Sequence, residues 1–193
     1  STDRQTRYQV RDLGGDVIAV HVRRDGPKGK KMWWEQPDGT KELNGLPVSE
    51  LPLFGSEDLA ALPDGTQIVV TEGEPARDAL RVIGIAAVGT VTGAGGTPGN
   101  DALRPLVRLN PVLWADNDEP GYPHMNRIAA RLSALGCSTV VIVDWPEAPL
   151  KGDAVQALKL GVDITQLMTS ARRWNPGNID LAALLCDIAA FLR

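Results

Sequence analysis

The first 45 residues alternate short β-rich runs with turn-like sequences. Segments 8–10, 17–22 and 31–36 are rich in β-branched and aromatic residues, and glycine- and proline-containing turns separate them. This pattern predicts strands joined into a small antiparallel meander. The proline-rich stretch that follows predicts a connector with a short helix at 56–62, for which Ser56 is the expected N-cap.

From residue 66 onwards, apolar runs alternate with amphipathic segments. The continuous apolar run at 67–71 is typical of a strand buried on both faces. Further strands are predicted at 85–88, 111–115 and 138–143, and helices at 75–83, 101–109, 122–135 and 153–160. This order predicts an α/β protein whose four-stranded parallel sheet carries helices on both faces.

Two further helices, at 163–173 and 179–192, predict a C-terminal helical appendage. We therefore expect three parts. These are a β-rich N-terminal subdomain (1–65), the α/β domain (66–160) and the C-terminal helices (161–193).

Composition narrows the classes of function. The length of 193 residues suits one domain with a small extension. The net charge of −4 argues against a protein that coats nucleic acid through its overall charge. No apolar run approaches the roughly 18 residues of a membrane span and no signal peptide opens the sequence, so we expect a cytoplasmic protein. Two cysteines, Cys137 and Cys186, are too few for a zinc ribbon and are expected to be buried thiols.

Basic residues concentrate near the N-terminus, directly before two tryptophans. The set is Arg23, Arg24, Lys28, Lys30, Lys31, Trp33 and Trp34. Such a set suits single-stranded nucleic acid, because charge holds the backbone and rings stack on bases. The alternative is a solvated hairpin in which the two tryptophans point to opposite faces of a strand, one in the core and one half-exposed.

Acidic residues follow three of the predicted buried strands. Glu72 follows the first, Asp116 and Asp118 follow the third, and Asp144 follows the fourth with Asp153 beyond it. In a parallel sheet these positions share the edge where ligands bind. Carboxylates gathered there raise one another's pKa, and a divalent cation relieves the repulsion. The alternative for each acid is that it caps the next helix.

Several other signals are weaker. The loop at 93–96 either cradles phosphate through its backbone amides or is a plain connection. Arg77 and Arg81 share one helix face by their i, i+4 spacing, which either reaches the acidic edge or is solvated. We expect neither His21 nor His124 to be a ligand.

Three motifs resemble the Toprim family, over about residues 66–160. Residues 70–74 with 78–80 resemble the first Toprim motif, and 116–121 resemble the second, Asp-x-Asp-x-x-Gly. Residues 151–154 resemble the Lys-Gly-x-Asp-Ala segment of phage and plasmid primases. The resemblance implies a Toprim-like, Rossmann-like sheet and phosphoryl-transfer chemistry dependent on Mg²⁺ or Mn²⁺.

The resemblance also implies roles for individual residues. Glu72 would be a metal ligand or general acid/base, Asp116 and Asp118 metal ligands, and Asp153 a weaker candidate for a second ion. Lys151 and Arg77 would join the basic set in contacting nucleotide or nucleic acid.

The β-rich lead resembles the region before Toprim in phage and plasmid primases and primase-helicases. It implies a DNA primase that makes primers from nucleoside triphosphates on single-stranded DNA during DNA replication. The chain has no P-loop and no zinc ligands, so a replicative helicase or zinc-binding module would act in trans. Ala76 stands where many primases carry an acid, with Asp78 as a possible substitute.

Other functions stay open at this point. A Toprim-class nuclease and a non-catalytic binding module are the alternatives, although the retained Glu72, Asp116 and Asp118 argue against the latter. Template preference, DNA or RNA product, oligomeric state and membership of a longer primase-helicase are also undecided.

Overall fold

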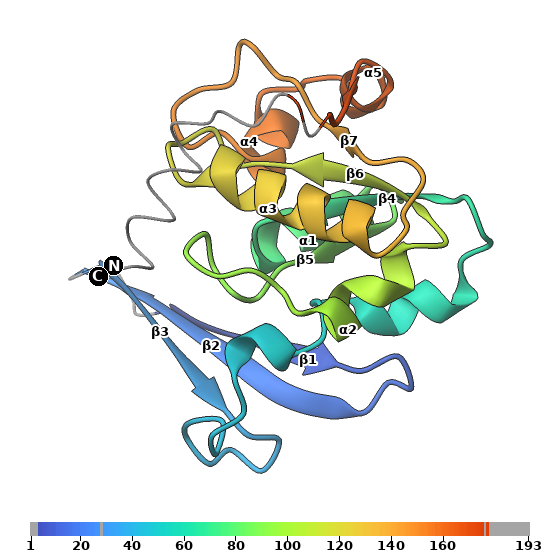
Figure 1. Cartoon of the computed structure of the whole chain (residues 1–193). Helices are drawn as coiled ribbons and strands as arrows, with labels where there is room; N and C mark the ends of the chain where they lie inside the picture. The colour runs from blue at the N-terminus through green and yellow to red at the C-terminus, as the bar shows by residue number, and fades with distance from the viewer. Residues whose placement is uncertain (1–3, 28, 176, 178–193) are drawn as a thin grey trace, which may run out of the picture.

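The N-terminal part of the chain is a small antiparallel sheet (Figure 1). The structure, a computed structural model, describes residues 4–27, 29–175 and 177. The strands β1 (Arg4–Arg11), β2 (Val17–Gly26) and β3 (Gly29–Glu35) pair in the order β1-β2-β3, which confirms the predicted meander. The turn between β1 and β2 is fixed by the Asp12 carboxylate, which accepts hydrogen bonds from two backbone amides of the turn.

The second sheet has five strands in the order β5-β4-β6-β7-β8. As predicted, the first four run parallel, and β8 is antiparallel to β7. The central strands β4 and β6 are covered on both faces, which explains their nearly unbroken apolar sequence. The strands are β4 (Gln67–Thr71), β5 (Ala87–Gly89), β6 (Asn110–Trp114), β7 (Val141–Ile142) and β8 (Arg172–Arg173).

Helices pack on both faces of this sheet (Figure 1). Val70 and Leu113 face a core formed with α2 and α3, whereas Val69 and Val112 face a core formed with α1, α4 and α5. The helices are α1 (Glu74–Val82), α2 (Asn100–Leu103), α3 (Gly121–Ala134), α4 (Ala154–Lys159) and α5 (Ile164–Thr169). No helix among the described residues is long and apolar enough to cross a membrane.

The chain after α5 differs from the prediction. The helix expected at 163–173 is wrong in its last turn, because the chain leaves α5 to form the edge strand β8. Pairing with β7 supplies backbone hydrogen bonds that replace further helix turns, and Arg172 forms an ion pair with Asp144 (2.8 Å). The helix predicted at 179–192, which contains Cys186, lies outside the described residues.

Two short helices also differ from the prediction. The segment at 101–109 forms α2 and then a single 3₁₀ turn that includes Pro105, whose missing N–H does not support a longer α-helix. The helix predicted at 56–62 is the 3₁₀ helix η2 (Ser56–Ala61). Ser56 is not its N-cap, because its buried hydroxyl donates instead to the carbonyl of Arg11 (2.7 Å).

The connector between the sheets fastens them together. Phe54 and Gly89 exchange two backbone hydrogen bonds of 2.8 and 2.9 Å, which extend the second sheet beyond β5. The Phe54 ring also packs edge-on against Tyr8 of β1. Val10 of β1 and Val91 after β5 belong to the same buried cluster. The inner face of the small sheet is therefore held against the second sheet.

Candidate active site

A cleft of about 500 Å³ lies between the small sheet and the carboxyl ends of β4 and β6. We call its acidic side the carboxylate wall, formed by Glu72, Asp116, Asp118 and Asp153. We call the side contributed by β2 and β3 the basic wall, formed by Arg23 and Lys30. Lys151 also lines the cleft. The four predicted carboxylates thus share one cavity at the edge of the sheet where α/β proteins bind ligands.

Glu72 and Asp116 are held together through the backbone. The Asp116 amide donates a 2.8 Å hydrogen bond to Oε1 of Glu72, which joins the loops after β4 and β6. Asp118 Oδ1 in turn accepts from the amide of Gly121 (3.0 Å) at the start of α3. A Cβ atom at Gly121 would lie 2.3 Å from the Asp116 carbonyl oxygen and 2.6 Å from Glu72 Oε1. The glycine of the Asp-x-Asp-x-x-Gly motif is therefore required by this close approach.

The electrostatics of the carboxylate wall favour a bound cation. Burial raises the pKa of Glu72 to about 7, and the nearby Asp116 and Asp118 carboxylates add to the shift. Burial also raises the pKa of Asp116 to about 6, with further contributions from Asp153 and Asp118 and an opposing one from Lys30. Repulsion among these groups is the situation that a divalent cation relieves.

Asn117, between the two aspartates, fixes the loop that carries Lys151 and Asp153. Its side-chain amide donates to the carbonyls of Ala148 (2.8 Å) and Pro149 (3.1 Å). Its backbone exchanges hydrogen bonds with the same loop, which holds Lys151 at a positive φ of 59°. Asp153 also caps α4, since its carboxylate accepts from the Gln156 amide, so the capping alternative holds for this acid.

Strand alternation divides the predicted basic set between two faces of the small sheet. In the β2–β3 register, Arg23 lies opposite Met32 and Trp34 opposite His21, and this face lines or adjoins the cleft. Arg24 lies opposite Lys31, and Val22 opposite Trp33, on the other face. Only part of the linear cluster therefore faces the carboxylate wall. Lys28 lies outside the described residues.

The structure places Arg77 outside the cleft. Its guanidinium, which is buried, forms ion pairs with Asp58 (2.6 Å) and Asp78 (2.9 Å) and lies 4.9 Å from the Phe54 ring centroid. Arg77 thereby ties α1 to the connector rather than reaching toward a ligand. Asp144 is likewise not a cleft residue, since it pairs with Arg172 of β8.

Sequence reasoning missed a buried pair at the base of the cleft. His21 of β2 and Glu74 at the start of α1 both line it, and Nδ1 of the histidine lies 2.5 Å from Oε1 of the glutamate. The His21 ring stacks on Trp34, with ring centroids 4.2 Å apart and planes at 11°. Glu74 belongs to the Glu-Gly-Glu sequence that follows the first buried strand. No local sequence pattern indicated that it would contact His21, which lies 53 residues earlier.

His124 of α3 organises the glycine-rich loop. It is fully buried, with Nδ1 3.0 Å from the Gly96 carbonyl and Nε2 3.2 Å from the Thr90 hydroxyl, which is 3.0 Å from the Glu72 carbonyl. Burial lowers the pKa of His124 to about 4. About one turn further along α3, Arg127 donates to the Ala94 carbonyl (2.5 Å). These contacts order the loop beside Glu72, which the alternative of a plain connection did not anticipate.

The residues of the carboxylate wall fit a magnesium or manganese ion. They offer oxygen ligands, and the pKa values of Glu72 and Asp116 are raised by burial and by repulsion from the neighbouring carboxylates. The described residues contain no group of three or more histidine, cysteine or carboxylate side chains placed to enclose a metal without help. An open arrangement is what Mg²⁺ commonly uses, because it binds one or two carboxylates and completes its shell with water and substrate phosphates.

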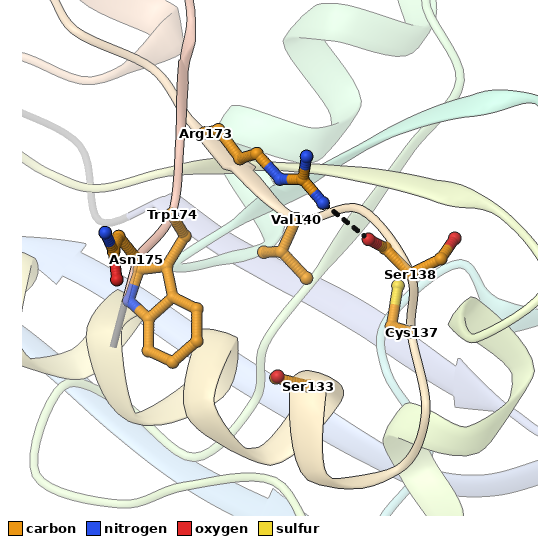
Figure 2. A pocket seen from close by; sticks show the side chains of 7 residues that line it. All are labelled: Ser133, Cys137, Ser138, Val140, Arg173, Trp174 and Asn175. Atoms are coloured by element: carbon orange, nitrogen blue, oxygen red, sulfur yellow. Dashed lines mark hydrogen bonds between the residues drawn. The ribbon is translucent and has the colours of Figure 1, made fainter. Parts of the chain in front are cut away.

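A second cavity, of about 410 Å³, differs in chemistry (Figure 2). It lies at the opposite, amino end of β7, between the end of α3 and the residues around Trp174. Cys137, a buried thiol as predicted, borders it, and Arg173 donates to the Ser138 carbonyl across its rim. None of the described residues that line this cavity is a carboxylate, in contrast to the first cleft.

The fold matches solved primase structures. A DNA primase domain from Pseudomonas aeruginosa superposes with a TM-score of 0.68 at 21% identity, over 88% of this chain and 52% of that one. The chain shares its fold with primase catalytic cores. A DnaG primase catalytic domain bound to single-stranded DNA gives a TM-score of 0.66 at 16% identity, over 88% and 53% of the two chains. An Aquifex aeolicus primase with zinc-binding and RNA polymerase domains gives a TM-score of 0.64 at 21% identity, over 89% of this chain and 41% of that one.

These comparisons define the fold at low sequence identity. The chain spans about half the length of the primase structures it matches. Neither the profiles of known protein families nor the sequences of curated proteins match it. The predicted α/β class, with an N-terminal antiparallel sheet and a mostly parallel second sheet, is confirmed.

Proposed function

We propose that this chain is a Toprim catalytic domain that joins nucleotides in a metal-dependent reaction and makes primers on a single-stranded DNA template. One observation carries the proposal: in a primase-core fold, the carboxylate wall faces the basic wall across a single cleft. Phosphoryl transfer requires this combination, because it depends on positioning and on neutralising the charge of phosphate oxygens.

Asp116 and Asp118 are the proposed holders of Mg²⁺ or Mn²⁺, and Asp153 is proposed for a second ion. When bound, such ions neutralise phosphate oxygens and lower the pKa of a nearby hydroxyl. Glu72 is suited to proton transfer because its pKa of about 7 lies near the working pH. We assign it the proton of the attacking 3′-hydroxyl, while pyrophosphate leaves from the incoming nucleotide.

The cationic residues of the cleft would bind the polyanionic substrates. Arg23, Lys30 and Lys151 lie on the lining of the cleft, where they can hold a triphosphate or the template backbone. The charge of Lys30 also lowers the pKa of Asp116, against the larger effect of burial. Because the two walls line one cleft, a single ligand there would meet both of them.

Primer synthesis tests the proposal directly. The full chain is incubated with single-stranded DNA, labelled nucleoside triphosphates and Mn²⁺, and the products are separated by length. Asp116→Asn should reduce synthesis about 1000-fold, because several kcal/mol of charge stabilisation are lost. Asp163→Asn is the matched control, since asparagine preserves the cap that Asp163 provides to α5.

The outcomes separate the candidate functions. Elongation that depends on Asp116 supports the proposal. Cleavage of the DNA without nucleoside triphosphates would instead identify a Toprim-class nuclease. Unchanged binding of nucleic acid with neither elongation nor cleavage would identify a binding module and overturn both enzymatic functions.

A further inference from the structure

The geometry points to His21 as a phosphate-binding residue of the cleft, held in place by Glu74 and Trp34. The inference rests on the proposed function for its class of ligand and adds a residue that none of the Toprim motifs contains. The ligand group is a phosphate oxygen, supplied either by the triphosphate of a nucleotide or by the backbone of the nucleic acid.

The orientation of the His21 ring is fixed on two sides. Glu74 binds Nδ1 at 2.5 Å, and the Trp34 ring lies parallel to the imidazole at 4.2 Å. Both side chains are largely buried, with exposures of 11% for His21 and 5% for Glu74. A ring that is stacked on one face and bonded at one nitrogen has little rotamer freedom left to lose on binding, which favours affinity.

The second ring nitrogen of His21 is available. Within the described part of the chain, Nε2 has no hydrogen-bond partner, and it is not among the polar atoms that are sealed from solvent. Since His21 lines the cleft, this nitrogen is available to a ligand there. With Nδ1 bound to a carboxylate, the imidazolium form offers Nε2–H as a donor, and a phosphate oxygen is an acceptor that stabilises this form.

The basic wall beside His21 supplies positive charge for an anion, whereas the carboxylate wall lines the other side of the cleft. Arg23 is two residues along the same strand face, and Lys30 contributes to the same lining from β3. Arg23 is oriented by a bidentate contact with Asp25 (2.9 Å). His124, by contrast, has both ring nitrogens within hydrogen-bond distance of protein oxygens and is fully buried. Of the two histidines in the chain, His21 is therefore the one placed to meet a ligand.

This contrast provides the test. The full chain is labelled with ¹⁵N-histidine, which gives two imidazole spin systems, and is titrated without divalent metal. One arm uses inorganic tripolyphosphate and the other a short oligodeoxythymidylate. We expect Nε2 of His21 to move toward its imidazolium position while both nitrogens of His124 stay in place. The responding arm identifies whether triphosphate or backbone phosphate is bound.

Two variants distinguish binding from a structural role. His21→Phe keeps a ring on Trp34 and should weaken phosphate binding about 10-fold, the scale of one charge-assisted hydrogen bond. Because this variant leaves Glu74 buried without a partner, Glu74→Gln is measured in parallel. It preserves an acceptor for Nδ1 but no longer supplies the negative charge that favours the imidazolium form of His21. Phosphate binding should therefore weaken about threefold. Mn²⁺ affinity should be unchanged in His21→Phe, since His21 is not part of the carboxylate wall.

Two results would overturn the inference. One is that neither phosphate ligand moves the His21 nitrogens at saturation. The other is that folded Glu74→Gln and His21→Phe proteins bind tripolyphosphate as the parent does. Because the titration needs no metal, template or turnover, its failure is distinguishable from failure of primer synthesis.

Discussion

The carboxylate wall of the cleft is held by contacts with the backbone, whereas the basic wall is placed by strand register and by a side-chain contact within β2. Glu72, Asp116 and Asp118 are positioned by the turns that follow β4 and β6 and by the close approach of Gly121. Arg23 and Lys30 depend on the register of β2 and β3, and Arg23 also on its contact with Asp25. The carboxylate wall should therefore be sensitive to added volume at Gly121, and the basic wall to the loss of the individual charges that register turns toward the cleft.

The largest expected effect comes from adding one methyl group to the carboxylate wall. Gly121→Ala should destabilise the fold by about 3 kcal/mol, because the new Cβ would overlap the Asp116 carbonyl and Glu72. It should also abolish primer synthesis. Urea denaturation and the synthesis assay measure the two effects. Gly95→Ala is the control, since nothing lies within 4 Å of its Cβ position; equal stability of the two variants would contradict the account.

Variants of Arg77 test whether this residue stabilises the fold or contacts a ligand in the cleft. Arg77→Met should cost about 2 kcal/mol of unfolding free energy, because it removes buried ion pairs and the contact with Phe54. Arg81→Met, on the same helix and also paired with Asp58, should cost less than about 0.5 kcal/mol because Arg81 is exposed. Folded Arg77→Met should bind tripolyphosphate normally in calorimetry. A loss of tripolyphosphate affinity in the folded variant would show instead that Arg77 contributes to ligand binding.

The raised pKa values of Glu72 and Asp116 predict a pH-dependent stability. Their folded pKa values, about 7 and about 6, lie above the ordinary values of 4.5 and 3.8. The folded chain therefore retains protons that the unfolded chain has released, so the free energy of unfolding falls as pH rises from about 4 to about 7. Mg²⁺ should raise the melting temperature by about 3 °C at pH 8 and less at pH 5, because protonated carboxyls bind metal poorly.

Thermal melts across this pH range make the measurement. In the double variant Glu72→Gln/Asp116→Asn the contribution of these two groups to the slope should vanish, and with it the response to Mg²⁺. A slope that persists unchanged would assign the pH dependence to other groups.

The smallest expected effect separates neighbouring lysines on the basic side. Lys30→Ala should weaken tripolyphosphate binding about threefold, whereas Lys31→Ala should change it by less than about 1.5-fold, since only Lys30 lines the cleft. Calorimetry at low salt compares the two. Equal losses of affinity in the two variants would show that the lysines act through the overall positive charge of the β2–β3 hairpin. The face on which each lysine lies would then not matter.

The difference between the walls also explains how far the sequence could predict the site. Asp116 and Asp118 follow a buried strand directly, so local sequence determined that they would reach the carboxyl edge. The alternation of Trp33 and Trp34 was foreseen as an alternative, but the sequence alone does not say which strand face turns toward the acids. The i, i+4 spacing of Arg77 and Arg81 identified a helix face without identifying Asp58 as the group against it.

Contacts between distant segments account for the remaining differences. Glu74 and His21 meet only because α1 and the small sheet pack together. Strand β8 is two residues long and exists through its pairing with β7, so its own residues carry too little pattern to predict it. Local turns were thus readable in the sequence, and long-range pairings were not.

Phe54 and Gly89 exchange two backbone hydrogen bonds at one place, and His21 and Glu74 pair at another. The Phe54 ring also packs on Tyr8 of the small sheet, so the two sheets are joined at more than two places. Attachment at several separate places leaves no single line about which the small sheet could turn. The width of the cleft is therefore set by packing and hydrogen bonds that are present before a ligand arrives.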